Sequence, residues 1–221
     1  MHYATAERRE HLKHGLRHDP FKAIVAPRPI GWISTVSATG VPNLAPYSFF
    51  NAVSDAPPMV MFSTVGRKDS LQNIEANGEF TCSVASQHLV DQMNLSSAAV
   101  AGEVNEYDLT GLATAPSLLV APPRVAASPA ALECRLWKTL ELPGEGAPIV
   151  VFGHVVAIYI DERVVTDGLL DTAAMRPLAR MGYMDYAVVT PETTFTLNRP
   201  RVGDDRRSAS VTPGPWDGIY R

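Results

Sequence analysis

The sequence predicts a mainly β protein built as a single antiparallel β-barrel with a few short helices. Two observations favour this class. Apolar residues recur with a period of two over residues 24–65, punctuated by turn residues, and many short strands with few helices are expected along the chain. A chain of 221 residues with 46% hydrophobic residues is long enough to bury one such core.

The first β region is typical of an antiparallel meander. Ile30–Val36 alternates partly, Thr39-Gly40 offers a hairpin turn, and Val41–Asn51 resumes the strand pattern. Pro57-Pro58 then precedes the strand VMFSTV. Prolines lie at the edges of these runs, where a strand tolerates a missing amide hydrogen.

Two short helices interrupt the strands. A leucine and an isoleucine three residues apart predict a helix over Ser70–Ala76, with Asp69 as its N-cap and Asn77-Gly78 as its stop. The strand Phe80–Ala85 follows. A second helix is expected over Gln87–Leu95, with its apolar residues on one side.

The second half predicts a loop-rich insert, Ser96–Arg124, and a long pair of strands, Leu132–Leu142 and Ile149–Ile160. The nearly continuous apolar run Val155–Ile160 is expected to face a barrel interior. We divide the chain into an N-terminal segment (1–20), one domain (21–200) and a C-terminal tail (201–221). The tail is rich in charge, Ser, Gly and Pro, which predicts a mobile segment or an arm laid on a partner subunit.

Composition argues against several classes of protein. A net charge of -4 gives no global basic field, which disfavours nucleic acid and a polybasic membrane anchor as partners. The N-terminus lacks an apolar signal region, and no run approaches ~18 apolar residues. Cys82 and Cys134 lack metal-type spacing and are expected to be buried, reduced thiols in a cytoplasmic protein.

The turn GRKDS, between the strand ending at Val65 and the first helix, is a candidate anion site. The first turn of a helix exposes unpaired N–H groups at the positive end of the helix dipole. Arg67, Lys68 and the Ser70 hydroxyl add donors that suit a phosphate dianion. The alternative interpretation is a solvated, charged turn with an ordinary aspartate cap.

The stretch NLAPYSFFNAVS places small polar residues among aromatic ones. Ser48 and Asn51 lie beside Tyr47, Phe49 and Phe50, so this segment is a candidate to line the mouth of the barrel around a flat heteroaromatic ring. The alternative is an ordinary strand with aromatic residues in the core and polar residues at the surface.

A series of motifs, in order, resembles the flavin reductase-like family of FMN-binding split barrels, the group of flavoredoxins and monooxygenase reductase components. The resemblance spans about Ile24 to Arg199, and the combination of motifs is more specific than any one of them. The segments that carry it are APRPIGWISTVSATGVPNLAPYSFFNAVS, PPMVMFST, RKDSLQNIEANGEF, MNLSS, NEYDLTGL, PPRVAASPAALECRLW, FGHVVAIYID and PLARMGYMDYAVV.

This resemblance implies a homodimeric, antiparallel Greek-key split β-barrel that binds FMN noncovalently near the subunit interface. Arg67, Lys68 and Ser70 would then hold the FMN phosphate, while Arg180 and Tyr186 would reach the flavin or the partner subunit. By position, the residues that would line the ribityl chain and the ring are Ser34, Thr35, Ser48, Phe49, Asn51, Ser63 and Thr64.

Two positions depart from the family pattern. Tyr183 stands where a second glycine is usual, and a bulky ring there would narrow the nicotinamide side of the pocket. His154 stands where an acidic residue is common; it is a candidate to contact NAD(P)H or tune a proton, although a strand histidine facing solvent is the plainer interpretation.

His11, His14 and His18 are spaced to share one helical face, which permits metal binding. Interleaved basic residues favour a solvated face instead, so no metal site is predicted.

The function that follows from the resemblance is an FMN-binding oxidoreductase, an NAD(P)H-dependent flavin reductase that supplies reduced flavin to a partner monooxygenase. NADH or NADPH would be the hydride donor, and no Rossmann glycine fingerprint is present to bind it. Two alternatives stay open: a flavoredoxin-like electron-transfer protein with little NAD(P)H turnover, and an FMN enzyme that acts on its own organic substrate beneath the 96–124 insert as a lid.

Overall fold

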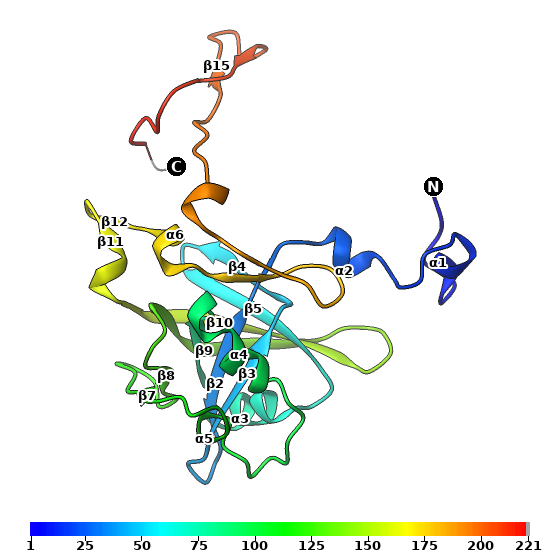
Figure 1. Ribbon diagram of the computed structural model, residues 1–221, viewed down its shortest axis with the longest axis vertical. Coiled ribbons are helices and arrows are strands. Elements are labelled where there is room, and N and C mark those ends of the chain that lie inside the picture. Colours follow the sequence, from blue (N-terminus) through cyan, green and yellow to red (C-terminus); the bar gives the residue numbers. More distant parts are fainter. Residues whose placement is uncertain (220–221) are drawn as a thin grey trace.

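Seven strands form one antiparallel sheet in the order β3-β2-β6-β9-β10-β5-β4 in the computed structural model, which describes residues 1–219 (Figure 1). These strands are β2 (Gly31–Val36), β3 (Pro42–Tyr47), β4 (Phe50–Asp55), β5 (Pro58–Val65), β6 (Glu79–Val84), β9 (Ala130–Glu141) and β10 (Pro148–Ile160).

The remaining elements are short strands and short helices outside this sheet. A three-stranded sheet contains β1 (Arg28–Pro29), β13 (Leu178–Arg180) and β14 (Tyr186–Val188). The two-stranded pairs are β7 (Thr114–Ala115) with β8 (Arg124–Val125), β11 (Val165–Thr166) with β12 (Leu169–Leu170), and β15 (Arg201–Val202) with β16 (Ala209–Ser210). The helices are α1 (Glu10–Lys13), α2 (Phe21–Ile24), α3 (Asp69–Asn77), α4 (Val90–Leu95), α5 (Glu106–Thr110) and α6 (Thr172–Met175).

The large sheet curls on itself. Strands β3 and β5 contact each other although they lie far apart in the sheet order. The amide of Ser63 also donates a hydrogen bond to the carbonyl of Phe49, which ties the β3–β4 connection to β5. The predicted antiparallel split barrel with few helices is therefore confirmed.

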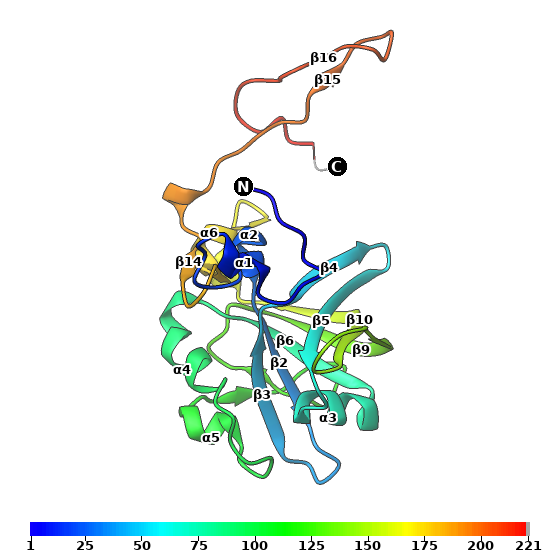
Figure 2. The same ribbon diagram turned by 90° about the vertical axis from the view of Figure 1, so that its right-hand side faces the viewer.

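The core has two main parts, one on each side of the β2–β3 hairpin (Figure 2). On one side, Leu71 and Ile74 of α3 are fully buried against the barrel interior, each contributing about 1.5–3 kcal/mol through burial. On the other, α4 and α5 cover Trp32 and Leu44. The helix α3 ends at Gly78, whose φ of 74° is the left-handed conformation expected of a glycine stop.

Several predicted boundaries were wrong. The expected strand Val41–Asn51 is broken between β3 and β4, since the chain turns at Ser48 and Phe49. The segment predicted as one helix over Gln87–Leu95 begins with a 3₁₀ turn, Gln87–Leu89, before α4. The N-cap of α3 is Lys68, in extended conformation, and Asp69 is already the first helical residue.

The prediction that Val155–Ile160 faces a barrel interior was also wrong at its end. Ile158 and Ile160 are 61% and 39% exposed, and the deeply buried part of β10 is Ile149–Val151 instead. A long β10 extends beyond the barrel, so its far end has no core to face. The pairing of the two long strands is as predicted, running from Ile149 opposite Glu141 to Ile160 opposite Ala130.

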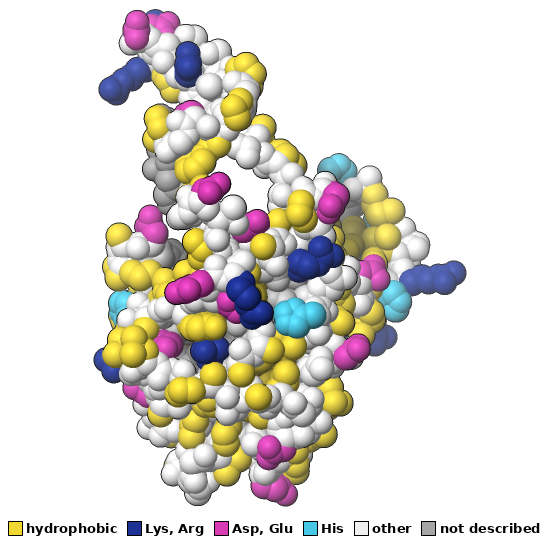
Figure 3. Space-filling view, turned by 60° about the vertical axis from the view of Figure 1, so that its left-hand side comes forward, with side chains coloured by type: hydrophobic (Ala, Val, Ile, Leu, Met, Phe, Trp, Pro, Cys, Tyr) yellow, Lys and Arg dark blue, Asp and Glu magenta, His cyan; other side chains and the backbone are white. Residues whose placement is uncertain are grey.

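Both chain ends lie outside the barrel. The segment containing β15 and β16 stands clear of the body, as the space-filling view also shows (Figure 3). The last two positions of the predicted tail, 220 and 221, lie outside the described residues, and the mobility of the tail stays a prediction. Among residues 1–219, every helix is too short or too polar to span a lipid bilayer.

Candidate functional site

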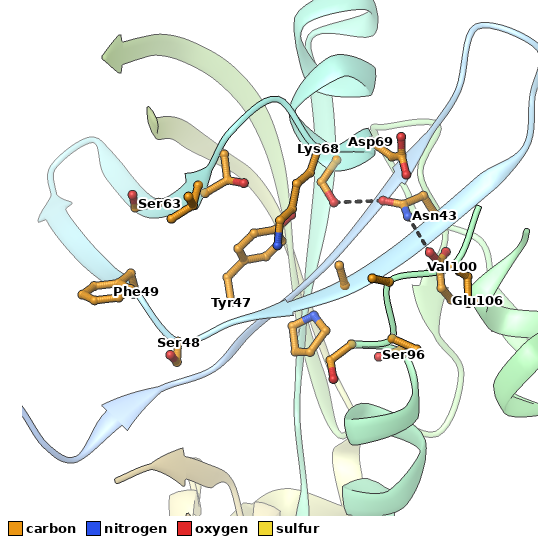
Figure 4. Close-up of a pocket in the computed structure, with 18 of the residues that line it drawn as sticks. Asn43, Tyr47, Ser48, Phe49, Ser63, Lys68, Asp69, Ser96, Val100 and Glu106 are labelled. Atoms are coloured by element: carbon orange, nitrogen blue, oxygen red, sulfur yellow. Dashed lines mark hydrogen bonds between the residues drawn. The ribbon is translucent and has the colours of Figure 1, made fainter. Parts of the chain in front are cut away.

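A cavity of about 480 Å³ opens between the N-terminal end of α3 and the β3–β4 corner (Figure 4). We call it the α3 cavity. Its walls come from β3, the end of β5, the first turn of α3 and the loop after α4. The residues that line it are Lys22, Asn43, Ala45, Pro46, Tyr47, Ser48, Phe49, Ser63, Thr64, Val65, Lys68, Asp69, Ser70, Ser96, Ser97, Ala98, Ala99, Val100 and Glu106.

The start of α3 presents donors to this cavity. Gly66, at a φ of 71°, turns the chain out of β5, and the extended Lys68 caps the helix without any side-chain cap bond. The first-turn amides of α3 are therefore left without a helical partner. The Lys68 side chain reaches into the cavity beside Tyr47 (Figure 4) and forms no ion pair within residues 1–219. This end of the cavity therefore combines a positive charge with free amide donors.

The neighbouring Arg67 is directed elsewhere. Its guanidinium forms an ion pair with Glu75, which lies further along α3. Arg67 itself is exposed. Gln72 also donates to the Arg67 carbonyl at 3.0 Å. Of the two predicted cationic ligands, the structure brings only Lys68 to the cavity.

A buried hydrogen-bond chain fixes the wall beside Lys68. The Ser70 hydroxyl donates to Asn43 Oδ1 at 2.9 Å, and Asn43 Nδ2 donates to Glu106 Oε1 at 2.9 Å. The other Glu106 oxygen accepts from the Leu44 amide at 3.0 Å. Both bonds of Asn43 to its side-chain neighbours are drawn in Figure 4. The Glu106 carboxylate is thus committed to β3, and Ser70 keeps only its oxygen lone pairs and its amide for a ligand.

The second carboxylate in the wall, that of Asp69, faces the loop after α4. A Cβ built on Gly102 would come within 3.3 Å of Asp69 Oδ1, so this carboxylate lies directly against that loop. Neither acid of the cavity wall therefore pairs with Lys68.

Tyr47 supplies a donor deeper in the cavity. It is 7% exposed, and within the described residues its hydroxyl has no hydrogen-bond partner. Burial raises the pKa of Tyr47, so the group is a neutral O–H at physiological pH. A buried hydroxyl without a partner costs free energy unless a ligand or water accepts from it.

A second cavity, of about 330 Å³, adjoins the first and shares Lys22, Pro46, Ser48 and Ser97 with it. We call it the arginine cavity, since Arg28 and Arg180 form part of its wall. Its remaining lining residues are Ile30, Met93, Asn94, Tyr183, Met184 and Tyr186.

The two arginines of this cavity are held by neutral groups. Arg28 is 6% exposed; it donates to the carbonyls of Lys22 and Val25, and to that of Met181 at 2.9 Å. Burial and the nearby charge of Arg180 lower the pKa of Arg28. Arg180 donates to the Tyr186 hydroxyl at 2.5 Å and to the Tyr183 carbonyl at 2.6 Å.

Tyr183 occupies an unusual backbone conformation at the rim of the arginine cavity. Its φ is 54°, in the left-handed region that glycine adopts most readily. The ring is about half exposed and lies 5.7 Å from that of His18, measured between ring centroids. The structure thus retains a glycine-like turn at this position while placing an aromatic ring over the cavity.

The structure gathers most of the predicted site residues but not all. Those that line one of the two cavities are Ser48, Phe49, Ser63, Thr64, Lys68, Ser70, Arg180, Tyr183 and Tyr186. Those that line neither are Ser34, Thr35, Asn51, Arg67 and His154. Every ligand role stays a prediction.

The residues outside the cavities have other neighbours. Ser34 and Thr35 are fully buried in β2, and Thr35 accepts from Asn73 at 3.0 Å. Asn51 is exposed on β4. His154 lies 6.3 Å from Trp137 between ring centroids, on the long β9–β10 pair.

Of the N-terminal histidines, His14 stacks on Tyr3 at 5.1 Å while His18 contacts Tyr183, so these two face different neighbours. Cys82 and Cys134 are buried and unbonded, as predicted, and burial raises the pKa of Cys82 to about 12.

Sequence reasoning missed Lys22, Arg28, Asn43 and Glu106 as parts of these cavities. Glu106 begins a short helix in the insert, and nothing in its local sequence indicates that its carboxylate reaches β3. Arg28 carried a signal that was not used: a charged residue inside an apolar strand pattern is buried only when its donors are satisfied.

The chain is similar to known proteins over most of its length. The domain described as "Flavin reductase like domain" matches residues 25–179. An uncharacterized protein of Deinococcus radiodurans is 39% identical over 200 residues, covering 85% of this chain and 86% of its own.

Two solved structures are similar in both fold and sequence. Nitrilotriacetate monooxygenase component B from Bacillus cereus matches with a TM-score of 0.80 and 26% identity, over 89% of this chain and 98% of its own. The 2-nitrobenzoate 2-nitroreductase of Pseudomonas fluorescens matches with a TM-score of 0.78 and 26% identity, over 92% of this chain and 100% of its own.

Proposed function

The chain belongs to the flavin reductase-like family, and on that premise we propose that it is an FMN-binding, NAD(P)H-dependent flavin reductase. The observation that carries this proposal is the α3 cavity. Lys68, which forms no ion pair within residues 1–219, and the uncapped amides of α3 lie at one end beside Tyr47, while Ser48 and Phe49 lie toward the other.

The groups in the α3 cavity fit FMN. A volume of about 480 Å³ falls within the range of about 300–1,000 Å³ usual for ligand pockets. The first-turn amides of α3 and the Lys68 ammonium suit a phosphate dianion. The Ser48 and Ser63 hydroxyls suit the ribityl chain, and the buried Tyr47 hydroxyl needs an acceptor.

Each part of the chain would then have a separate task. Lys68 and the amides of α3 would hold the phosphate, while the Ser70–Asn43–Glu106 chain keeps the first turn of α3 at a fixed distance from β3. Phe49, at the other end of the cavity, would exclude water from the flavin ring. When bound, FMN would supply the redox chemistry, because its ring accepts a hydride from a reduced nicotinamide without a protein acid or base.

We also propose that the protein is a homodimer. Exposed apolar side chains lie on three strands of the large sheet: Val53 on β4, Trp137 and Leu140 on β9, and Ile158 and Ile160 on β10. A second copy of the chain that covered part of this surface would remove apolar area from water. Light scattering of the purified protein would give twice the chain mass.

The proposed recipient of reduced flavin is a monooxygenase. One structurally similar protein is itself named as a monooxygenase component. A flavin that leaves the protein needs an open route, and Phe49 and Lys68, at the two ends of the cavity, are both exposed.

A second candidate, an electron-transfer flavoprotein with little NAD(P)H turnover, is favoured by Tyr183. This ring lies at the rim of the arginine cavity and contacts His18, which narrows the approach for a nicotinamide. Anaerobic stopped-flow reduction separates the two candidates: a reductase is reduced rapidly by NADH or NADPH, whereas an electron carrier responds to a ferredoxin-like donor instead.

The test of the main proposal is an absorbance spectrum of the protein reconstituted with FMN, recorded before and after NADH or NADPH. We expect stoichiometric FMN that is bleached by at least one of them. Lys68→Ala and Ser70→Ala should both weaken FMN retention, the lysine change more so, because it removes a full charge. Protein that takes up no FMN would refute the proposal.

A further inference from the structure

The arginine cavity contains three cationic side chains and no acidic one. Lys22, Arg28 and Arg180 all line it, and its other lining residues are apolar or neutral. Within residues 1–219, none of the three forms an ion pair. Three positive charges around one small cavity repel one another, so an anion in the cavity would be stabilised by all three.

The arginines are also fixed in place before any ligand arrives. Three backbone carbonyls hold the Arg28 guanidinium, and its Nε is buried without a partner. Arg180 donates to the Tyr186 hydroxyl and to the Tyr183 carbonyl. Its guanidinium also lies over the Tyr186 ring, 4.5 Å from the ring centroid. Cations that are already oriented lose little conformational entropy when they bind.

Lys22 differs from Arg28 because it is exposed. Its ammonium lies 5.9 Å from the centroid of the Phe49 ring, at the boundary that the two cavities share. Of the three cations in the arginine cavity, Lys22 is the one that also lines the α3 cavity.

We propose that the arginine cavity binds the oxyanion of a second ligand, a carboxylate or a phosphate, whose body lies against the flavin pocket. Arg180 and Lys22 contact the oxyanion, and Arg28 supplies a fixed positive charge behind them. The apolar part of the ligand packs on Ile30 and Met93. The substrate of this protein is thus anionic. This inference adds a substrate class to the proposed function, and it rests on that function only for the position of the flavin.

The cavity volume limits the ligand. About 330 Å³ is at the small end of ligand pockets and suits one ring or a short chain with its charged group. Two sources carry the same chemistry: a small organic carboxylate, or the phosphate of a nicotinamide dinucleotide that enters partly.

The test measures binding directly, by isothermal titration calorimetry on protein reconstituted with FMN. The probes are benzoate, the neutral and nearly isosteric benzamide, and the oxidised dinucleotide NAD⁺. The variants are Lys22→Met and Arg180→Gln. Lys22→Met is the cleaner one, since the Lys22 side chain makes no hydrogen bond within the described residues and its carbonyl bond to Arg28 is kept. Arg163→Gln is the control, an exposed arginine remote from both cavities.

We expect benzoate to bind at least about tenfold more tightly than benzamide. Lys22→Met and Arg180→Gln should each lower the benzoate affinity at least about tenfold, because a charge-assisted hydrogen bond is lost. Arg163→Gln should leave the benzoate affinity unchanged. Loss of NAD⁺ binding in the same two variants, without benzoate binding, would support the phosphate source. Binding of both anions that is unchanged in Lys22→Met and Arg180→Gln, or no binding of either, would overturn the proposal.

The calorimetry also separates this proposal from the proposed function. FMN content is measured by absorbance in the same samples. Protein that takes up no FMN but binds benzoate through Lys22 and Arg180 contradicts the flavin reductase assignment and supports the anion site. Protein that retains FMN but shows no variant-dependent anion binding contradicts only the anion site.

Discussion

The two ends of the combined cavity offer positive charge in different ways. At the α3 end, one exposed lysine and a set of backbone amides come from a single turn of the chain. At the arginine end, the three cations come from two segments far apart in sequence, Lys22 and Arg28 from one and Arg180 from the other, and Arg28 is almost fully buried. At the α3 end, changing Lys68 alone removes the charged side-chain contact to a ligand. At the arginine end, changing the buried Arg28 affects both ligand binding and the stability of the fold.

The largest difference between the two ends is expected in Arg28→Met. This change removes the donor that serves the carbonyls of Lys22, Val25 and Met181, and so disconnects the N-terminal segment from the loop after β13. We expect the free energy of unfolding to fall by about 2–4 kcal/mol, because hydrogen bonds from a charged donor contribute about 1.5–3 kcal/mol each and water can replace those to the exposed Lys22 and Val25. Urea denaturation measures it; an unchanged midpoint would mean that Arg28 is not structural.

Glu106→Gln tests the wall that supports the α3 end. The glutamine must present its NH₂ to either Asn43 Nδ2 or the Leu44 amide, both of which are donors to Glu106. We expect a loss of about 1–3 kcal/mol in unfolding free energy and weaker FMN binding, since Asn43 also holds Ser70. The exposed Glu103→Gln is the control. Equal behaviour of the two variants would remove Glu106 from the support of α3.

Tyr183 allows a smaller test at the arginine end. Tyr183→Gly and Tyr183→Ala both remove the ring, but only alanine keeps a Cβ at a φ of 54°. The glycine variant should be more stable by about 1 kcal/mol, because the left-handed conformation costs an L-residue about that much. Thermal or urea unfolding of the pair measures the difference, and an alanine variant at least as stable as the glycine one would contradict the strain.

Arg67→Ala should have the smallest effect. Its guanidinium pairs with Glu75 on the surface of α3, outside the cavity. An exposed ion pair contributes about 0–1 kcal/mol, so unfolding free energy should change little and FMN affinity should stay near that of the unmodified protein. An FMN affinity as low as that of Lys68→Ala would show that Arg67 moves into the cavity when the ligand binds.

The α3 end could be predicted from sequence because it is local. A strand, a glycine turn, a lysine and a helix start lie within a few residues, and helix geometry alone places the free amides beside Lys68. The direction of Arg67 could not be predicted, because the choice between the cavity and Glu75 depends on a partner further along the helix. The extended N-cap at Lys68 instead of Asp69 is a change of one residue that sequence patterns rarely resolve.

The arginine end was beyond sequence reasoning for a physical reason. Arg180 joins Lys22 and Arg28 only after β1 pairs with β13, which sets Arg28 directly opposite Arg180 in the register. Long-range strand pairing is not encoded in any local period. Ser34 and Thr35 of β2 are fully buried, and Thr35 bonds to Asn43 in the cavity wall instead of lining the cavity itself.

The most direct measurement of the central idea compares the affinities for FMN and riboflavin, which differ only by the phosphate, in the unmodified protein and in Lys68→Ala. We expect the unmodified protein to prefer FMN by at least about tenfold and the variant to lose most of that preference, while its riboflavin affinity stays unchanged, because one charge-assisted bond to phosphate is removed. Equal loss of affinity for both ligands, or no loss for either, would show that the phosphate does not lie at Lys68 and the start of α3.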